Sequence, residues 1–491
     1  MERIPEKLCT KVMSAEDAAS LIQTGMTVAV SGFTRTNYPK AVPQAVARQG
    51  TAKDLTLIVG AAVGDCIDGA WTRAGLLKRR YGHQSNKDLR KAINADQVEF
   101  SDIHISHLPK YMNERTGPHI DIALIECCAI TEEGLYLGAS GGTADAAVRN
   151  ADKVIVEVNR SLPLGFMGMH DIFEVGVAPA SRIIPISHPQ DRIGTPYIPC
   201  PLEKIAAVVF TDEADEAQTF KAVTPATAKI AENIVDFLKN EIQHGRLPEN
   251  PGPLQSGVGS VGNAVLAGLA TSGFHHLNMY TEVMQDAALG LLDQGVLDFI
   301  STSSVALTDE NRKRFYETIQ DYHDQILIRP NEISNHPEVI RRLGVISLNT
   351  PIEVDLYGNV NSTHIDGTAM MNGLGGSGDF ARNARISIFA SESVAKHGAI
   401  SSIVPFVSHV DQTEHDVDVI VTEQGIADLR WLTPKERARV LIDHCAHPDY
   451  RPMLEEYYQE AYASAKGKHT PHVLEKAFSW HLKYLQTGSM K

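Results

Sequence analysis

Cysteine and basic side chains are scarce in this chain of 491 residues. Its six cysteines show no C-x-x-C spacing, which indicates free thiols in a reducing compartment rather than a disulfide framework. Lysine and arginine total 45 against 60 aspartates and glutamates, and the formal charge is −15. Because the sequence has no basic stripe, we do not expect a nucleic-acid partner. A small anion is not excluded, because a few lysines and helix N-termini can bind one.

Long apolar runs are also missing. No stretch reaches the roughly 18 apolar residues of a membrane span, and the first 14 residues contain Glu2 and Glu6 with no apolar targeting segment. We therefore expect a cytoplasmic protein without a membrane partner. The hydrophobic content of 43% and charged content of 21% are those of folded globular proteins, and the length predicts at least two domains.

One order of elements occurs twice in the chain. Over residues 14–47 we expect a helix, a short apolar strand, a Ser-Gly turn and a second helix. The same order of elements is expected over residues 224–269. The turns are Ser31-Gly32 and Ser256-Gly257. We therefore predict two related α/β halves, residues 1–222 and residues 223–491.

The remaining strand-like runs are continuous rather than alternating. Continuous apolar runs separated by helices are typical of parallel strands that are covered on both faces. The fold class is therefore α/β, with two similar, open, mainly parallel sheets and a helical C-terminal extension beyond Thr433, including a terminal helical stretch at 472–485. The expected strands are 55–60, 120–125, 154–158, 325–328, 345–348, 386–389, 403–407 and 417–422.

Two glycine clusters match G-x-G-x-x-G. Residues 257–262 match it before an expected helix, and Glu282 follows Gly262 by twenty residues, as a dinucleotide fingerprint requires. This keeps an NAD-linked oxidoreductase as an alternative, although Pro251 and Pro253 make the preceding segment a poor central strand. The second match, at 373–378, shows how weak the pattern is, and either cluster could be a plain glycine turn.

Glu282 allows two interpretations. An acid at the carboxyl end of a strand over 277–280 points into the crevice where α/β folds bind ligands. Its position alone instead favours a helix N-cap or first-turn acid without a chemical role.

Metal ligation is not predicted. His364, His409 and His415 lie near Asp411 and Asp416, but their spacing matches no metal signature. No H-E-x-x-H or P-loop motif is present.

Several segments, taken together and in order, resemble the acetyl-CoA hydrolase/transferase family. This family is a branch of the family I CoA-transferases that includes acetate, propionate and succinate CoA-transferases, and the resemblance covers nearly the whole chain. The segments that carry it are 31–34, 39–43, 256–269, 280–286, 334–338, 372–383 and 422–429.

The resemblance implies a set of site residues. It makes Glu282, in the second half, the nucleophile, assigns the oxyanion hole to the amides of Val258 and Gly376, and places Asn335 and Glu423 beside the active site as supporting residues. It implies CoA-binding positions at Gly257, Val258, Gly259, Ser260, Val261, Asn372, Gly376 and Lys396. No metal and no tightly bound cofactor are implied, since coenzyme A enters as the substrate acyl-CoA.

The implied activity is transfer of CoA between a short-chain acyl-CoA (acetyl-, propionyl- or succinyl-CoA) and a small carboxylate such as acetate or succinate, through a glutamyl-CoA thioester on Glu282. An acetyl-CoA hydrolase that uses the same glutamate is the alternative, because water could intercept the acyl-enzyme. The oligomeric state stays open, with a homodimer as the common arrangement.

The chain departs from the family at three places. Asn37 and Trp431 stand where glycine is expected, and no arginine lies in the stretch 211–220, where some acetate-using members carry one. The last departure matters because an arginine fork suits a carboxylate.

Overall fold

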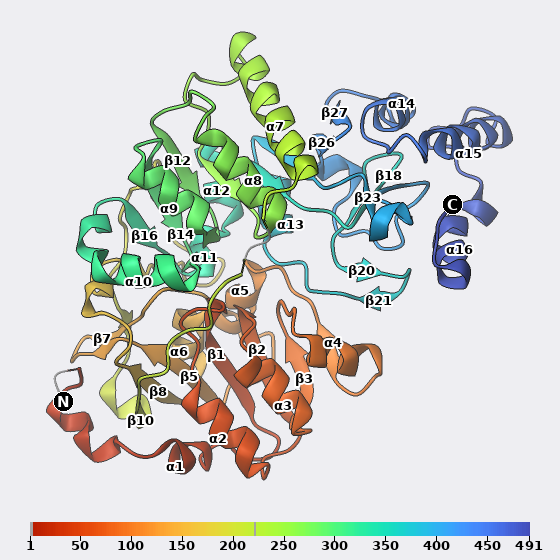
Figure 1. The fold of residues 1–491 in the computed structure, drawn as a ribbon. Helices are drawn as coiled ribbons and strands as arrows, with labels where there is room; N and C mark the ends of the chain where they lie inside the picture. Colours follow the sequence, from red (N-terminus) through yellow and green to blue (C-terminus); the bar gives the residue numbers. More distant parts are fainter. Residues whose placement is uncertain (1–2, 220–221) are drawn as a thin grey trace. The chain divides into compact units, whose positions relative to one another are not determined.

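The computed structural model describes residues 3–219 and 222–491, which form two compact units (Figure 1). Unit 1 comprises Met1–Thr219, Asn278–Leu292 and Asp298–Leu343, and unit 2 comprises Phe220–Leu277, Asp293–Leu297 and Gly344–Lys491. Much of the segment 278–343 thus packs with the N-terminal part of the chain. The division of the sequence into halves at residue 222 stays a prediction.

Unit 1 contains a seven-stranded parallel sheet in the order β10-β8-β5-β1-β2-β3-β4. The chain runs outward from β1 to β4, then restarts beside β1 with β5 and runs outward the other way. The β1–β5 boundary is therefore a topological switch point, where α/β sheets bind ligands at the carboxyl ends of their strands. The strands are β1 (Thr27–Thr34), β2 (Leu55–Ala62), β3 (Leu77–Tyr81), β4 (Glu99–Ser101), β5 (Ile122–Cys127), β8 (Lys153–Asn159) and β10 (Ile205–Thr211).

Helices cover both faces of this sheet, which explains the continuous apolar runs. Along β1, Val28 and Val30 pack into one buried cluster, while Ala29 packs into another. α2 and α3 lie over one face in Figure 1. The helices are α1 (Ala15–Ala19), α2 (Ala41–Gln49), α3 (Ala70–Arg73), α4 (Lys87–Asn94), α5 (His107–Asn113) and α6 (Ala144–Asn150), and a small sheet adds β6 (Ala129–Ile130), β7 (Gly134–Tyr136) and β9 (Ile198–Pro199).

The later segments of unit 1 add three neighbouring strands in the order β16-β14-β12 and a short parallel pair, β13 with β15. The strands are β12 (Leu277–Tyr280), β13 (Val283–Met284), β14 (Leu297–Thr302), β15 (Ser304–Val305) and β16 (Ile326–Ile328). The helices are α9 (Asp286–Asp293), α10 (Asp309–Glu317), α11 (Asn331–Ser334) and α12 (Pro337–Leu343).

Unit 2 contains strands in the order β11-β17-β22-β26-β27, parallel except for β27 at the edge. They are β11 (Leu254–Ser256), β17 (Ile346–Asn349), β22 (Ile386–Ala390), β26 (Val419–Thr422) and β27 (Gly425–Asp428). Short strands add β18 (Glu353–Asp355), β19 (Val360–Asn361), β20 (His364–Ile365), β21 (Ala369–Met370), β23 (Val394–Ala395), β24 (Ile400–Ser401) and β25 (Ile403–Val404). The helices are α7 (Pro225–Gln243), α8 (Ser260–Leu269), α13 (Ser377–Asn383), α14 (Pro434–His444), α15 (Arg451–Ser464) and α16 (Ser479–Thr487).

The mixed α/β class with mainly parallel sheets and the helical C-terminal region is as predicted. Three local predictions were wrong. Ser31-Gly32 is not a turn but a bulge inside β1, where Gly32 has φ +108° and a Cβ would lie 2.7 Å from Cβ of Tyr38. The strand expected over 403–407 ends at Val404, and the terminal helix starts only at Ser479.

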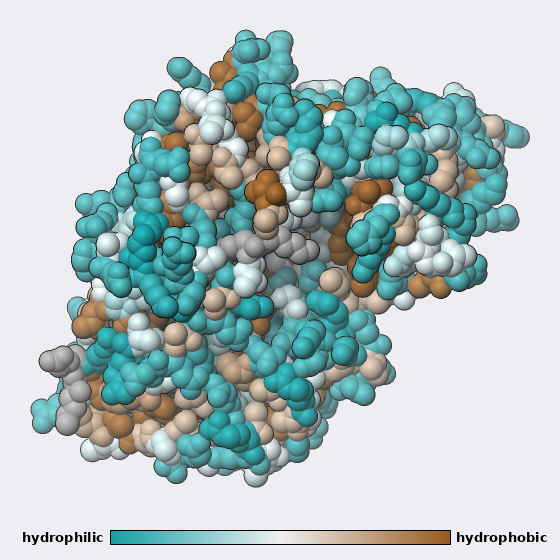
Figure 2. All heavy atoms as spheres, in the orientation of Figure 1, coloured by the Kyte–Doolittle hydropathy of each residue, from teal (hydrophilic) through white to brown (hydrophobic). Residues whose placement is uncertain are grey.

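Hydrophilic side chains cover most of the face shown in Figure 2. Among the described residues, no helix has both the length and the apolar character needed to cross a membrane.

Candidate active site

Glu282 follows β12 in unit 1, and its main chain is tightly fixed. Its carbonyl oxygen accepts hydrogen bonds from the amides of Ser303 (3.0 Å) and Ser304 (2.9 Å) and from the Thr302 hydroxyl (3.0 Å). The next helix, α9, begins at Asp286, which is the acid of its first turn. Glu282 therefore neither caps a helix nor lies in the first turn of one. The interpretation of Glu282 as a helix-capping or first-turn acid was wrong.

Asn335 holds the Glu282 side chain. It lies at the end of α11, and its Nδ2 donates to Oε1 of Glu282 over 2.6 Å. The Ser334 hydroxyl donates to Oδ1 of Asn335 over 2.8 Å, so the amide is turned with its NH2 toward the glutamate. The Tyr280 hydroxyl in turn donates to the carbonyl of Ile333 over 2.6 Å, which ties α11 to β12. Glu282 and Asn335, both predicted site residues, are thus brought together.

Loops of the seven-stranded sheet surround this segment. The Thr36 hydroxyl, after β1, lies 2.8 Å from the Ser304 hydroxyl, and the amide of Gly141 donates to the carbonyl of Ser303 over 2.9 Å. An apolar cluster of Phe33, Ala61, Ile105, Val283 and Ala306 packs directly beside the glutamate. Sequence reasoning missed these partners, although the run Ser301-Thr-Ser-Ser304 at a strand end was a readable signal.

A buried lysine anchors the loop after β1. Nζ of Lys40 lies 2.7 Å from Oε1 of Glu126 and 2.8 Å from Oδ1 of Asp215, and its side chain is 4% exposed. Burial raises the pKa of the Glu126 carboxyl to about 8, although the lysine opposes the shift. Because an unpaired buried charge is costly, this cluster holds residues 31–40 in one conformation.

The first glycine cluster lies in unit 2, at the start of α8. Gly259 precedes the helix with φ +139°, while Ser260 and Val261 form its first turn. Val258, in this turn, is 51% exposed. Amides at a helix N-terminus suit anionic groups. The preceding segment, expected to be a poor central strand, is the buried strand β11, paired with β17, because Pro251 and Pro253 precede it and remove no hydrogen bond from its ladder.

The second cluster lies before α13, also in unit 2. Gly376 is the residue before the helix, with φ −91°, and Gly375 has φ +64°. Nδ2 of Asn372 donates to the carbonyls of Ser362 (3.1 Å) and Gly373 (3.0 Å), which closes the loop. Asn372 thus shapes the loop that carries the Gly376 amide.

Glu423 and Lys396 lie on other loops of unit 2. Glu423, which follows β26, accepts hydrogen bonds from the Ser393 amide over 2.8 Å, from the Ser393 hydroxyl and from Nε2 of Gln424 over 2.9 Å. Burial opposes ionisation, but these donors outweigh it and lower the pKa of Glu423 below its usual range. Lys396 is exposed and has φ +51°.

The two replacements of glycine both lie in the left-handed region. Asn37 has φ +53° and Trp431 has φ +64°. Asparagine tolerates this conformation, and Asn37 is further held by the Gly138 amide, which donates to its Oδ1 over 2.8 Å. Trp431 is fully exposed and strained. The stretch 211–220, which contains no arginine, is described up to residue 219 and includes Asp215 and Glu216. Phe220 lies outside the described residues.

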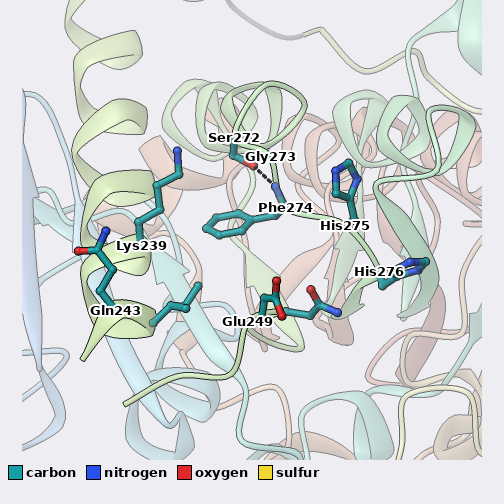
Figure 3. A pocket seen from close by; sticks show the side chains of 10 residues that line it. Lys239, Gln243, Glu249, Ser272, Gly273, Phe274, His275 and His276 are labelled. Atoms are coloured by element: carbon teal, nitrogen blue, oxygen red, sulfur yellow. Dashed lines mark hydrogen bonds between the residues drawn. The ribbon is translucent and has the colours of Figure 1, made fainter. Parts of the chain in front are cut away.

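A cavity of about 570 Å³ lies in unit 2, and none of the predicted site residues lines it (Figure 3). Lys239 and Gln243 extend into it from α7, opposite Phe274. Its residues 249–250 precede β11 and residues 274–276 precede β12. It therefore lies at the amino ends of the strands, opposite the ends where α/β sheets bind ligands.

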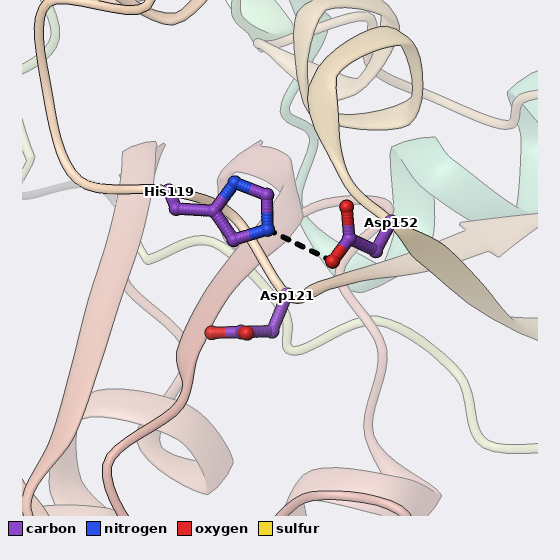
Figure 4. Close-up of side chains that lie close together, drawn as sticks. All are labelled: His119, Asp121 and Asp152. Carbon is purple, nitrogen blue, oxygen red and sulfur yellow. Dashed lines mark hydrogen bonds and ion pairs between the residues drawn. The ribbon is translucent and has the colours of Figure 1, made fainter.

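Among residues 3–219 and 222–491, one group has three side chains close enough to share a metal ion: His119, Asp121 and Asp152 (Figure 4). Nε2 of His119 lies 2.8 Å from Oδ2 of Asp152, and Asp121 accepts from the amide of Thr27 over 2.7 Å. His119 and Asp152 thus form a surface ion pair, and Asp121 anchors the start of β1, which explains why the three side chains lie together. His364 and His409 instead stack, with ring centroids 3.9 Å apart.

Comparison with known proteins places the chain in a family. Residues 2–210 match the acetyl-CoA hydrolase/transferase N-terminal domain, and residues 312–458 match the C-terminal domain. The chain is 51% identical over 490 residues to a succinyl-CoA:acetate CoA-transferase of Clostridium kluyveri, covering 99% of this chain and 91% of that protein. It is 42% identical over 518 residues to an acetyl-CoA hydrolase of Schizosaccharomyces pombe, covering 99% of each.

Solved structures share the fold. RipA from Yersinia pestis superposes with a TM-score of 0.72 at 22% identity, covering 92% of this chain and 97% of that chain. A 4-hydroxybutyrate CoA-transferase from Porphyromonas gingivalis gives 0.66 at 23% identity, covering 93% and 99%. By its full-length relatives and both domain matches, the chain belongs to the acetyl-CoA hydrolase/transferase family.

Proposed function

We propose that this protein is an acyl-CoA:carboxylate CoA-transferase that exchanges CoA between short-chain acyl-CoA and small carboxylates such as acetate and succinate. The observation that carries the proposal is the setting of Glu282, whose main-chain carbonyl is held by three donors and whose carboxylate is oriented by Asn335 at 2.6 Å. The 51% identity to a succinyl-CoA:acetate CoA-transferase supports the substrate classes.

The reaction takes place in two exchanges on Glu282. A carboxylate oxygen of Glu282 attacks the thioester carbonyl, the C–S bond breaks, and a mixed anhydride and CoA thiolate form. The thiolate attacks the glutamyl carbon of the anhydride, the C–O bond breaks, and the carboxylate product leaves a glutamyl-CoA thioester. A second carboxylate reverses both steps and takes the CoA. No net proton transfer is needed.

Each step passes through a tetrahedral oxyanion. We assign its stabilisation to the amides of Val258 and Gly376, each donor of this kind contributing about 10²–10³ in rate. The position of Val258 just before the N-terminus of α8 and the loop closed by Asn372 support this assignment. Asn335 acts on the nucleophile instead, by restricting the carboxylate to one orientation before attack.

CoA binding is assigned to the turn from Gly257 to Val261, to Asn372 and Gly376, and to Lys396. The helix N-terminus of α8 and the exposed lysine are the groups that suit the phosphates of CoA. Glu423 is fixed as an anion and supports its loop. CoA is thus a substrate and not a resident cofactor. A cytoplasmic location and a homodimer stay predictions.

Hydrolysis of acetyl-CoA is the second candidate, and the 42% identity to an acetyl-CoA hydrolase favours it. The test is to incubate the enzyme with acetyl-CoA, with and without succinate, and to separate the CoA species. We expect succinyl-CoA to form faster than free CoA. Equal release of free CoA with and without an acid would make the enzyme a hydrolase, and a change in NADH absorbance would revive the oxidoreductase.

A further inference from the structure

The loop after β1 brings an arginine to the edge of the nucleophile's surroundings. Phe33 and Thr36 exchange main-chain hydrogen bonds of 3.2 and 3.1 Å, so Thr34 and Arg35 form the tip of a tight turn. This turn lies at the carboxyl end of β1, at the switch point of the seven-stranded sheet. The polar ends of ligands are bound at this edge in α/β folds.

The tip is connected to Glu282 through one serine. The hydroxyls of Thr34 and Thr36 lie 3.4 and 2.8 Å from the hydroxyl of Ser304. The amide of Ser304 donates to the carbonyl of Glu282 over 2.9 Å. Arg35, between the two threonines, is therefore separated from the nucleophile's main chain by two hydrogen-bonded links.

The guanidinium of Arg35 is held loosely. Its Nη1 lies 3.6 Å from Oε2 of Glu216, beyond hydrogen-bond length, and the two side chains are 43% and 36% exposed. The other cation of this loop, Lys40, is buried between two carboxylates. Arg329, also in unit 1, is fully buried and paired with Asp171. Arg35 thus lies in a loop that is hydrogen-bonded to the surroundings of Glu282, its side chain is partly exposed, and its guanidinium can donate hydrogen bonds to a ligand.

The chemistry favours such a cation. The second exchange brings an acid substrate, itself an anion, to attack the glutamyl-CoA thioester, and a nearby cation attracts and orients it. An arginine fork binds a carboxylate through two parallel hydrogen bonds. We propose that Arg35 binds the carboxylate of the acid substrate, which displaces Glu216 from the guanidinium. This rests on the proposed CoA-transferase function and assigns its acid-binding residue.

The test measures KM separately for acid and for acyl-CoA. Arg35→Gln should raise KM for acetate and succinate about 10- to 100-fold, the loss of a charge-assisted hydrogen bond, with KM for acyl-CoA unchanged. Arg35→Lys should fall between, because it keeps the charge without the fork. Glu216→Gln should lower KM for the acid, because it removes the competing carboxylate. Arg48→Gln, which alters an exposed pair with Glu16 on the same unit, is the control.

The opposite signs expected for Arg35→Gln and Glu216→Gln distinguish substrate binding from a structural ion pair. A KM for the acid in Arg35→Gln equal to that of Arg48→Gln overturns the assignment, as does a parallel rise in Glu216→Gln. Intact-mass analysis of Arg35→Gln after acyl-CoA is added should detect glutamyl-CoA. This measurement separates failure of the Arg35 assignment from failure of the proposed CoA-transferase function. Absence of the adduct and of transfer in the unmodified enzyme would reject the proposed function itself.

Discussion

Two glutamates, Glu282 in unit 1 and Glu423 in unit 2, each follow a strand, yet the hydrogen bonds that anchor them differ. Glu423 is fixed through its carboxylate, which accepts from the Ser393 amide at 2.8 Å, from the Ser393 hydroxyl and from Gln424. Glu282 is fixed through its main-chain carbonyl, which accepts from Ser303, Ser304 and Thr302, and its carboxylate accepts from Asn335 at 2.6 Å.

The difference lies in where each residue is anchored. Donors on a carboxylate lower its pKa and with it the basicity of its oxygens. At Glu282 three donors fall on the main-chain carbonyl, and Asn335 donates to Oε1 of the carboxylate and orients it. By this comparison Glu282 is suited to attack, and Glu423 is suited to remain an anion that organises its loop.

Replacing the two glutamates should give very different losses. Glu282→Ala should abolish both transfer and the glutamyl-CoA adduct while CoA affinity is retained, because the assigned CoA-binding residues lie elsewhere in the sequence. Glu282→Asp, which withdraws the carboxylate by one methylene, should cost about 10²-fold in turnover. Glu423→Gln should leave the adduct detectable by intact-mass analysis. An inactive Glu423→Gln with active Glu282→Ala would reverse the two roles.

The amide of Gly376 comes next in expected effect. Gly376→Val should lower turnover about 10²- to 10³-fold by moving the amide from the developing oxyanion. The cost in stability should be small, because Gly376 has φ −91°, which a side chain can adopt. Gly117→Val, at a site with nothing within 4 Å of a Cβ, is the control. Near-native turnover of a folded Gly376→Val would make the loop structural only.

What the sequence could predict depended on how local the signal was. The motif around Glu282 and the two glycine clusters are contiguous, so the resemblance assigned them directly. The contact between Thr36 and Ser304 joins residues 268 positions apart, and such pairing is set by topology, not by a local pattern.

Backbone detail also escaped prediction. Pro253 argued against a strand that begins at the next residue, since a short strand needs no donor from the residue before it. Ser31-Gly32 had turn composition, but the close approach of Tyr38 makes it a bulge. The packing of residues 298–343 into unit 1 had no signal in the repeat. The parallel strands, by contrast, could be predicted from continuous apolar runs, because both faces of the sheet are buried.

The partners of the two glutamates sharpen the comparison further. Asn335→Ala removes a hydrogen bond to the nucleophile's carboxylate and should lower turnover about 10- to 100-fold. Ser334→Ala frees the amide to rotate and should cost about 5-fold, a neutral hydrogen bond. Ser393→Ala, the matched change at Glu423, should cost less than Asn335→Ala. Turnover of the three variants, measured at saturating acyl-CoA, checks the order, and a larger loss in Ser393→Ala would contradict it.

The smallest effect at neutral pH, and a large one in acid, is expected from a buried histidine of unit 1. Nε2 of His170 lies 2.8 Å from the carbonyl of Gly138, in the loop that also holds Asn37. Burial lowers the pKa of His170 to about 4, although the carbonyl favours the charged form. The ring is therefore neutral in the fold and donates to the carbonyl through Nε2. In the unfolded chain its pKa is about 6.5.

The sign of the pH dependence follows from these two values. Between pH 6.5 and 4 the unfolded chain binds a proton that the folded one does not, so the free energy of unfolding falls as the pH falls. The limit for one such group is about 3 kcal/mol at low pH. His170→Gln keeps a donor for the Gly138 carbonyl but cannot titrate. Denaturant unfolding at pH 7 and pH 5 should show a smaller acid loss in His170→Gln than in the unmodified protein, with His469→Gln, at an exposed histidine, as the control. Equal losses in all three proteins would mean that the proton taken up by His170 does not destabilise the fold, and would contradict the prediction.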